Sequence, residues 1–201
     1  MDKSRLEAFS DGVFAVAITL LALNLAVKGP GQHLANELWD LWPSFLAYLV
    51  SFLTIGIIWV NHHVLIRAIS KVDRTLLFLN LVLLLFVVLI PFATATVAQY
   101  RLQGPGARAS VALYAAVFLG MSVGFGAIFE WTLHGDRRHQ QLPPHQHWPA
   151  RIRFVSGGAV YLIAFGVALL NAIASFVIIA LVAVYYIVER TPSDDGAGTG
   201  G

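Results

Sequence analysis

The feature that most constrains this chain is a series of long runs almost free of charged residues. Five such runs cover residues 12–27, 43–60, 76–97, 110–129 and 154–188. A helix that crosses the hydrocarbon core of a bilayer needs about 20 apolar residues, with a range of roughly 17–25. Each of the first four runs predicts one such helix, the first extended by Ala8 and Phe9, and the fifth is long enough for two short helices that turn near Asn171. The sequence therefore predicts an all-α integral membrane protein with six transmembrane helices.

Composition agrees with this class and leaves no room for a second folded domain. Hydrophobic residues make up 58% of the chain and charged residues 12%, against about 45–50% and about 25% in soluble domains. We expect one membrane domain over residues 1–190 and a flexible tail over residues 191–201. The predicted spans are about 8–27, 43–66, 75–98, 108–131, 153–170 and 173–189. The absence of cysteine excludes disulfides and thiolate metal ligands.

Orientation follows from the distribution of Lys and Arg in the short flanking segments. With six spans and the amino terminus inside, ten of the 13 Lys and Arg residues fall in the inner segments, and the outer segments hold Lys28, Arg101 and Arg108. Both termini should therefore be cytoplasmic. The net charge of +2 reports this topology and gives no indication of nucleic-acid binding.

The first helix has a regular pattern of two neighbouring stripes. At about 100° per residue, one stripe is bulky and apolar, with residues 9, 13, 16, 20, 23 and 27. The second stripe is small, with residues 8, 12, 15, 19, 22 and 26. Small stripes let helix backbones approach closely in lipid. The bulky stripe has three possible neighbours, namely lipid, another helix or a symmetry axis.

Polar residues gather at the expected inner ends of the first three spans. A charge at the edge of a span is costly unless it is paired, and it usually points into the protein. We expect Arg5 and Asp11 to form an ion pair, with other groups satisfying the remaining donors and acceptors. The expected cluster contains Arg5, Ser10, Asp11, Trp59, His63 and Asn80. Its simplest interpretation is a structural clamp that holds the first helix.

The string Arg5-x-x-x-Phe9-Ser10-Asp11 at the start of the first span resembles the signature of the transmembrane protein 175 family, the endosomal and lysosomal potassium channels and their single-repeat prokaryotic relatives. The resemblance extends to Trp59-x-x-x-His63 at the end of the second span and to Asn80 and "PFATA" (91–95) in the third.

The resemblance implies a passive potassium channel in which the first helix lines a central pore. The matching constriction positions are Val16, Leu20 and Leu23, with Thr19 beside them, and all three apolar residues lie on the bulky stripe. A chain with one six-helix repeat would need four copies, so the implied partners are potassium ions, the lipid bilayer and a homotetramer. No cofactor is implied. Val16 is smaller than the isoleucine or leucine common at this position in the family, which predicts a wider constriction.

The string "SVGFG" (122–126) invites comparison with the carbonyl filter of ordinary potassium channels, in which four extended loops strip water from the ion. Here it lies inside an uninterrupted apolar run, and a re-entrant loop would put the basic segment 134–153 outside. We therefore expect no re-entrant filter loop, and we interpret Gly120-x-x-x-Gly124 as a helix-packing pair.

The inner segment 134–153 contains His134, His139, His145 and His147, and histidine-rich tracts bind metals. No acidic or thiolate partner has a suitable spacing, and Pro143–Pro144 favours an extended loop. We therefore expect a solvated loop and no metal site.

Enzymatic function finds no support, because the chain has no HExxH, GxSxG or phosphate-loop string, and we expect no catalytic residues. The main alternative is a small-molecule or ion-coupled exporter or carrier, with a structural membrane protein third. Coupled carriers usually place an ionisable residue near the midplane of the bilayer, and no span of this chain has one there.

Overall fold

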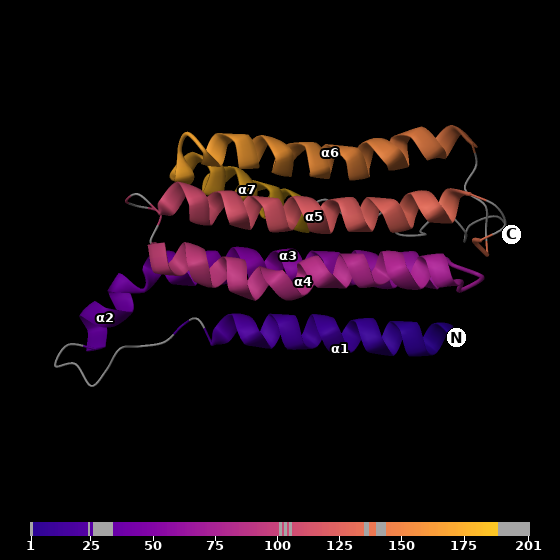
Figure 1. The fold of residues 1–201 in the computed structure, drawn as a ribbon, viewed down its shortest axis with the longest axis horizontal. Helices are drawn as coiled ribbons and strands as arrows, with labels where there is room; N and C mark the ends of the chain where they lie inside the picture. Colours follow the sequence, from indigo (N-terminus) through magenta and orange to yellow (C-terminus); the bar gives the residue numbers. More distant parts are fainter. Residues whose placement is uncertain are drawn as a thin grey trace, which may run out of the picture.

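The computed structural model of the chain describes residues 2–23, 25, 34–100, 102, 104, 106–134, 137–139 and 144–188, except for the side chains of 144–147, 149, 150, 153, 154 and 188. Regular structure in these residues consists of helices, as the sequence predicts. Figure 1 shows them running nearly parallel or antiparallel, except for the short α2. Their bounds are α1 Lys3–Ala22, α2 Leu34–Asp40, α3 Trp42–Arg67, α4 Arg74–Tyr100, α5 Ala107–Leu133, α6 Pro144–Ala168 and α7 Ala172–Val188.

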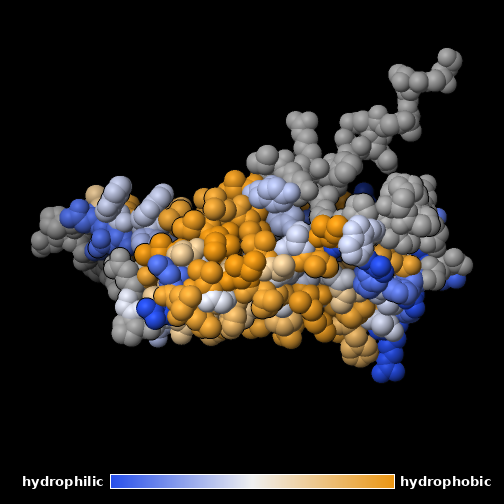
Figure 2. Space-filling model, turned by 90° about the horizontal axis from the view of Figure 1, so that it is seen from above, coloured by the Kyte–Doolittle hydropathy of each residue, from blue (hydrophilic) through white to orange (hydrophobic). Residues whose placement is uncertain are grey.

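Three of these helices, α3, α4 and α5, are long and apolar enough to cross a membrane. Shorter apolar segments lie within α6 and α7, at Val155–Ala168 and Ala172–Ile187. One face of the molecule shows a broad hydrophobic band with hydrophilic residues at both ends (Figure 2). This arrangement is the one that a bilayer requires, because the backbone is hydrogen-bonded within helices wherever the surface is apolar.

The helices pack in layers, with α1 on one side of the molecule (Figure 1). Among the described residues, α1 packs on α3 and α4, and the most extensive contact is between α4 and α5. Helices α6 and α7 cover the other side of α5, and α7 also reaches α3. Helix α1 is therefore a peripheral helix in a single chain, held through one face only.

Close packing of α4 on α5 depends on glycine. A Cβ atom at Gly124 would lie 3.0 Å from the Cα atom of Leu83, and one at Gly120 would overlap the ring of Phe86. The string "SVGFG" thus belongs to the continuous helix α5, and its first glycine brings two helix backbones together, as the packing interpretation expects.

A buried chain of hydroxyl groups joins α3, α4 and α5, nearer the start of α3 and α5 and the end of α4. Thr94 donates to the backbone oxygen of Ile90 (2.7 Å), so the 2.7 Å contact between Ser51 and Thr94 has Ser51 as donor. Tyr114 must then donate to Ser51, also at 2.7 Å. Each hydroxyl hydrogen has an acceptor, which is what polar groups in an apolar interior require.

Two parts of the chain differ from the sequence prediction. The short helix α2 lies between the first two predicted spans, where no helix is expected, and α6 begins at Pro144 although Pro143–Pro144 predicts an extended loop. The second difference has a simple cause: a proline at the first helical position has no amide hydrogen bond to lose, and its fixed φ suits a helix. The turn near Asn171 is present, and Asn171 caps α7 by accepting from the amide of Ala174 (3.0 Å).

Candidate functional site

The face that α1 turns to its own chain is narrow and closely packed. Its buried residues follow spacings of four, four, three and four, which is one face of a helix. They are Leu6, Ser10, Phe14, Ala17 and Leu21. Val13 and Ile18 are partly buried beside them. This face packs on α3 and α4 and fixes the rotation of α1 about its axis.

Four residues of the bulky stripe lie away from the rest of the chain, whereas Val13 of the same stripe is partly buried against the core. The exposed fractions of the four side chains are 50% for Phe9, 56% for Val16, 39% for Leu20 and 73% for Leu23. The neighbouring small stripe is open as well, since a Cβ atom at Gly12 would meet nothing within 4 Å. Of the three neighbours that the sequence leaves open for the bulky stripe, the structure thus excludes a helix of the same chain over these residues.

Three buried polar side chains link α1, α3 and α4 near the end of the bundle at which α1 begins. The hydroxyl of Ser10 donates to the backbone oxygen of Leu6 (2.9 Å), so it accepts from the Asn80 amide nitrogen at 3.0 Å. The Asn80 side-chain oxygen then faces Nε2 of His62 at 2.8 Å, and His62 must carry its proton on Nε2. No more than 2% of any of these three residues is exposed.

His62 replaces His63 in this cluster. The sequence argument selects His63 because it lies four residues after Trp59, and the two rings are indeed neighbours, with centroids 6.4 Å apart. The ring inside the bundle, however, is that of His62, which also lies against Phe14. A pattern in the sequence indicates this: Ser44, Ala47, Ser51, Thr54, Ile58, His62 and Leu65 continue one stripe with spacings of three and four.

Asp11 is paired with Trp59 and not with Arg5. The indole Nε1 of Trp59 donates to a carboxylate oxygen of Asp11 at 2.8 Å. The expected ion pair is wrong for the single chain, since the described ion pairs do not include one between Arg5 and Asp11. Residues six apart lie about 120° from each other around a helix, so Arg5 falls on the exposed side, near the line of Phe9 and Val16.

Lys3 ties the start of α1 to the end of α3, a contact that the sequence does not predict. Its ammonium group donates to the backbone oxygens of Arg67 (2.8 Å) and Ile69 (2.9 Å). Carbonyl groups at a helix carboxyl end lack partners within the helix and attract cations. Lys3 therefore anchors α1 at the same end of the bundle as the polar cluster.

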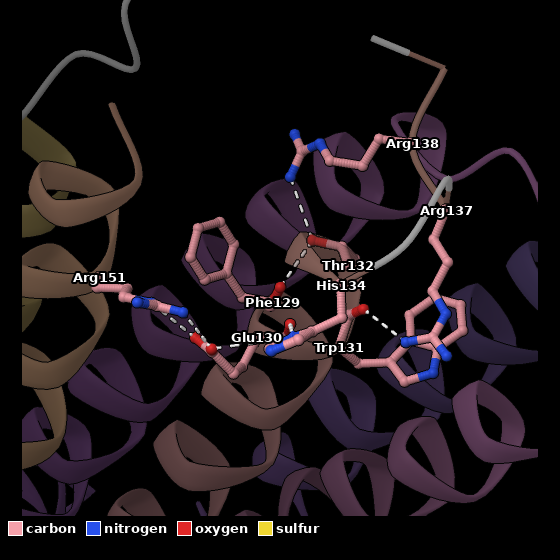
Figure 3. A network of polar contacts seen from close by, with 8 residues as sticks. All are labelled: Phe129, Glu130, Trp131, Thr132, His134, Arg137, Arg138 and Arg151. Carbon is pink, nitrogen blue, oxygen red and sulfur yellow. Dashed lines mark hydrogen bonds and ion pairs between the residues drawn. The ribbon is translucent and has the colours of Figure 1, made fainter. Parts of the chain in front are cut away.

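The segment after α5 packs against the α3–α4 turn. Ser70 donates its amide hydrogen to the backbone oxygen of Arg137 (2.8 Å), and His139 donates to that of Ala68 (3.0 Å). Figure 3 shows how basic side chains surround the end of α5.

In this network the guanidinium of Arg137 lies 4.5 Å from the centre of the Trp131 ring, and that of Arg151 donates to Glu130 at 3.0 Å. Arg138 donates to the hydroxyl of Thr132 at 3.2 Å, and burial lowers the pKa of its guanidinium. These contacts hold the segment on the bundle.

The histidine-rich segment forms no metal site among the described residues. His134 contacts the backbone oxygen of Glu130 (2.8 Å), and His139 contributes its backbone amide. The side chains of His145 and His147, which the sequence makes the better metal candidates, lie outside the described residues.

The family model described as endosomal/lysosomal potassium channel TMEM175 matches residues 5–91. These residues include most of α1, all of α3 and most of α4, and thus the whole polar cluster.

Relatives match over nearly the full chain. A protein of Streptomyces collinus named as a potassium channel is 40% identical, over 95% of this chain and 94% of its own. One of Chamaesiphon minutus, also named as a potassium channel, is 35% identical over 92% and 93%. The crystal structure of a lysosomal potassium-selective channel TMEM175 homologue from Chamaesiphon minutus superposes with a TM-score of 0.81 at 32% identity, over 92% of this chain and 96% of that one.

Proposed function

We propose, from the premise that this chain belongs to the TMEM175 family of potassium channels, that it conducts potassium passively through a pore lined by α1 in a homotetramer. The observation that carries the proposal is the exposed bulky stripe of α1. The large apolar side chains of this stripe suit a surface that meets identical copies. The stripe also lies on a helix that packs on its own chain through one face only.

The constriction belongs to Val16, Leu20 and Leu23. All three are exposed in the single chain, and seven residues of helix separate the first from the last, a rise of about 10.5 Å. Four copies of each side chain around an axis form three successive apolar rings. Narrow apolar rings control ion flow because water is expelled from the constriction. An ion cannot cross the dry segment without its water.

Thr19 supplies a polar group between these rings. Its hydroxyl is exposed and donates to the backbone oxygen of Val16 at 2.9 Å. Because that bond uses the hydroxyl hydrogen, the oxygen lone pairs remain directed outward and can accept from water or contact a cation. Thr19 is therefore the group that interrupts the apolar lining.

The inner polar cluster serves to set the rotation of α1. Ser10 and Asp11 are consecutive residues on α1, and they bond to different helices, through Asn80 of α4 and Trp59 of α3. Two attachments in different directions stop the helix from turning. Phe9 and the constriction residues then keep their direction toward the axis.

The proposed topology has six spans with both termini inside. Besides α3, α4 and α5, helices α1, α6 and α7 would cross the bilayer, and the Lys3 anchor, the α3–α4 turn and the end of α5 would all lie at the cytoplasmic surface. The basic residues around this end, including Arg67, Arg74 and Arg137, support this orientation.

Flux of potassium into liposomes tests the function itself. Purified chain reconstituted into vesicles should pass potassium down its gradient with no other substrate present. A carrier would move potassium only together with a coupled solute or ion. Flux that appears only when such a substrate is added would contradict a passive pore.

A further inference from the structure

The short helix α2 has two different sides. Over residues 34–42, at about 100° per residue, the apolar side chains occupy one arc of about 160°, and the polar ones occupy the remainder. The apolar arc consists of Leu34, Ala35, Leu38, Trp39, Leu41 and Trp42. The polar arc consists of Asn36, Glu37 and Asp40.

Most of the apolar arc is left uncovered by the described part of the chain. None of the residues of α2 is buried, and the exposed fractions of Leu34, Leu38, Trp39 and Trp42 lie between 52% and 81%. An exposed patch of large apolar side chains beside a polar side marks an interaction surface.

Position and charge decide which partner fits. Figure 1 shows that α2 leaves the bundle toward the side of α1, beyond the outer end of that helix and away from α6. The exposed stripe of α1 ends there, at Leu20 and Leu23. The surface of α2 is thus on the same side of the molecule as the proposed subunit interface.

The charge of the segment argues against a lipid headgroup as the partner. Residues 34–42 contain two acidic residues, Glu37 and Asp40, and no Lys or Arg. Helices that bind the surface of anionic membranes carry basic residues on the polar face.

We infer that the apolar arc of α2 packs against a second copy of this chain, so that four α2 helices form a collar around the outer mouth of the pore. This inference depends on the proposed function, because the second copy is the neighbouring subunit of the same tetramer. Asp40 then lies on the arc that faces water, and the wall of the outer mouth is complete only with the neighbouring copy.

Single cysteines test the collar directly, because the chain has no cysteine of its own. Leu38→Cys and Trp39→Cys place a thiol on the apolar arc, and Asn36→Cys places one on the polar arc of the same helix. In proteoliposomes treated with a short bismaleimide, the first two should give covalently linked subunits on a denaturing gel, and Asn36→Cys should give far fewer. Leu23→Cys is the control for the α1 interface, and Leu181→Cys, exposed on α7, is the control for random collision.

The outcomes separate this inference from the proposed function. Linkage through Leu23→Cys without linkage through either position of the apolar arc overturns the collar and leaves the pore intact. Quenching of the tryptophan fluorescence by brominated lipids, if clearly weaker in Trp39→Phe than in the wild type with its five tryptophans, would then assign the arc to the lipid interface. Absence of linkage at Leu23→Cys as well overturns the tetrameric pore, and the collar with it.

Discussion

At the scale of single residues, the account depends on which side chains of α1 pack on their own chain and which are exposed. Ser10 and Phe14 face inward, whereas Val16 and Leu20 face outward. Phe14 and Val16 are both apolar, and they differ mainly in their rotation about the helix. The function therefore depends on the direction in which each side chain points.

Replacing Val16 by alanine should widen the constriction and raise the potassium flux. The smaller side chain leaves room for water, so the barrier to ion entry falls, and each reduction of about 1.4 kcal/mol raises the rate tenfold. Potassium flux into liposomes, or current in a planar bilayer, measures the effect. Val13→Ala is the matched control, because Val13 is partly buried against the core; a flux that rises equally in both variants would argue against a ring at Val16.

His62 and His63 provide a matched pair for the polar cluster. His62→Ala removes the partner of the buried Asn80 oxygen and should lower the free energy of unfolding by about 1–3 kcal/mol. His63→Ala removes only a ring contact with Trp59 and should have a much smaller effect. Thermal unfolding in detergent, measured as the fraction of protein that stays folded, compares the two variants. Equal shifts of the unfolding temperature would contradict the buried role of His62.

At the scale of helices, much of the fold is predictable from the sequence, and the parts that are not have physical reasons. Runs without charge identify α3, α4 and α5, because a bilayer leaves few alternatives for such segments. The helix α2 is missed because its residues are too few for a span and lie beside glycine and proline. The beginning of α6 is missed because a proline pair can equally begin a helix.

The candidate site shows the same division. Among the predicted cluster residues, Trp59 contacts Asp11 and Asn80 contacts Ser10. The predicted Arg5–Asp11 ion pair is wrong because the two residues, although close in height along α1, lie about 120° apart around it. The Lys3 anchor has no signal in the sequence, because its acceptors are backbone oxygens.

The packing of α4 on α5 predicts opposite effects at two nearby glycines. Gly124→Ala brings a methyl group to 3.0 Å from the Leu83 backbone, so the helices must separate, at a cost of about 1–3 kcal/mol. Gly126→Ala meets nothing within 4 Å and should be neutral or stabilising, since alanine favours a helix by about 0.5–1 kcal/mol. Thermal unfolding of the two variants in detergent decides, and a stable Gly124→Ala protein would contradict the close approach.

The Lys3 anchor predicts a local change in dynamics. Lys3→Met removes both bonds to the end of α3, so the first turn of α1 should open more often. Amide hydrogen exchange over residues 4–9 should become faster, and Ser4→Ala, at an exposed position, should leave it unchanged. Unaltered protection in Lys3→Met would show that the polar cluster alone holds the helix.

At the scale of the whole molecule, the single chain has the form of one subunit. Helix α1 packs on α3 and α4, α4 packs on α5, and α5 packs on α6 and α7. This arrangement leaves α1 on one side of the molecule (Figure 1). A helix with an apolar stripe and two hydrogen-bonded attachments behind it is a suitable lining for a narrow pore. In the proposed tetramer, four such subunits would turn this peripheral helix into a central one.

The most direct test of this claim is thiol accessibility along α1 in reconstituted protein. Single cysteines at residues 16, 20 and 23 are treated with a charged, membrane-impermeant thiol reagent while potassium flux is recorded, with Ala17→Cys and Leu21→Cys as controls on the buried face. The account predicts block at 16, 20 and 23 and none at 17 and 21. Flux that persists after treatment of all three exposed positions, or block confined to the buried face, would contradict a pore lined by α1.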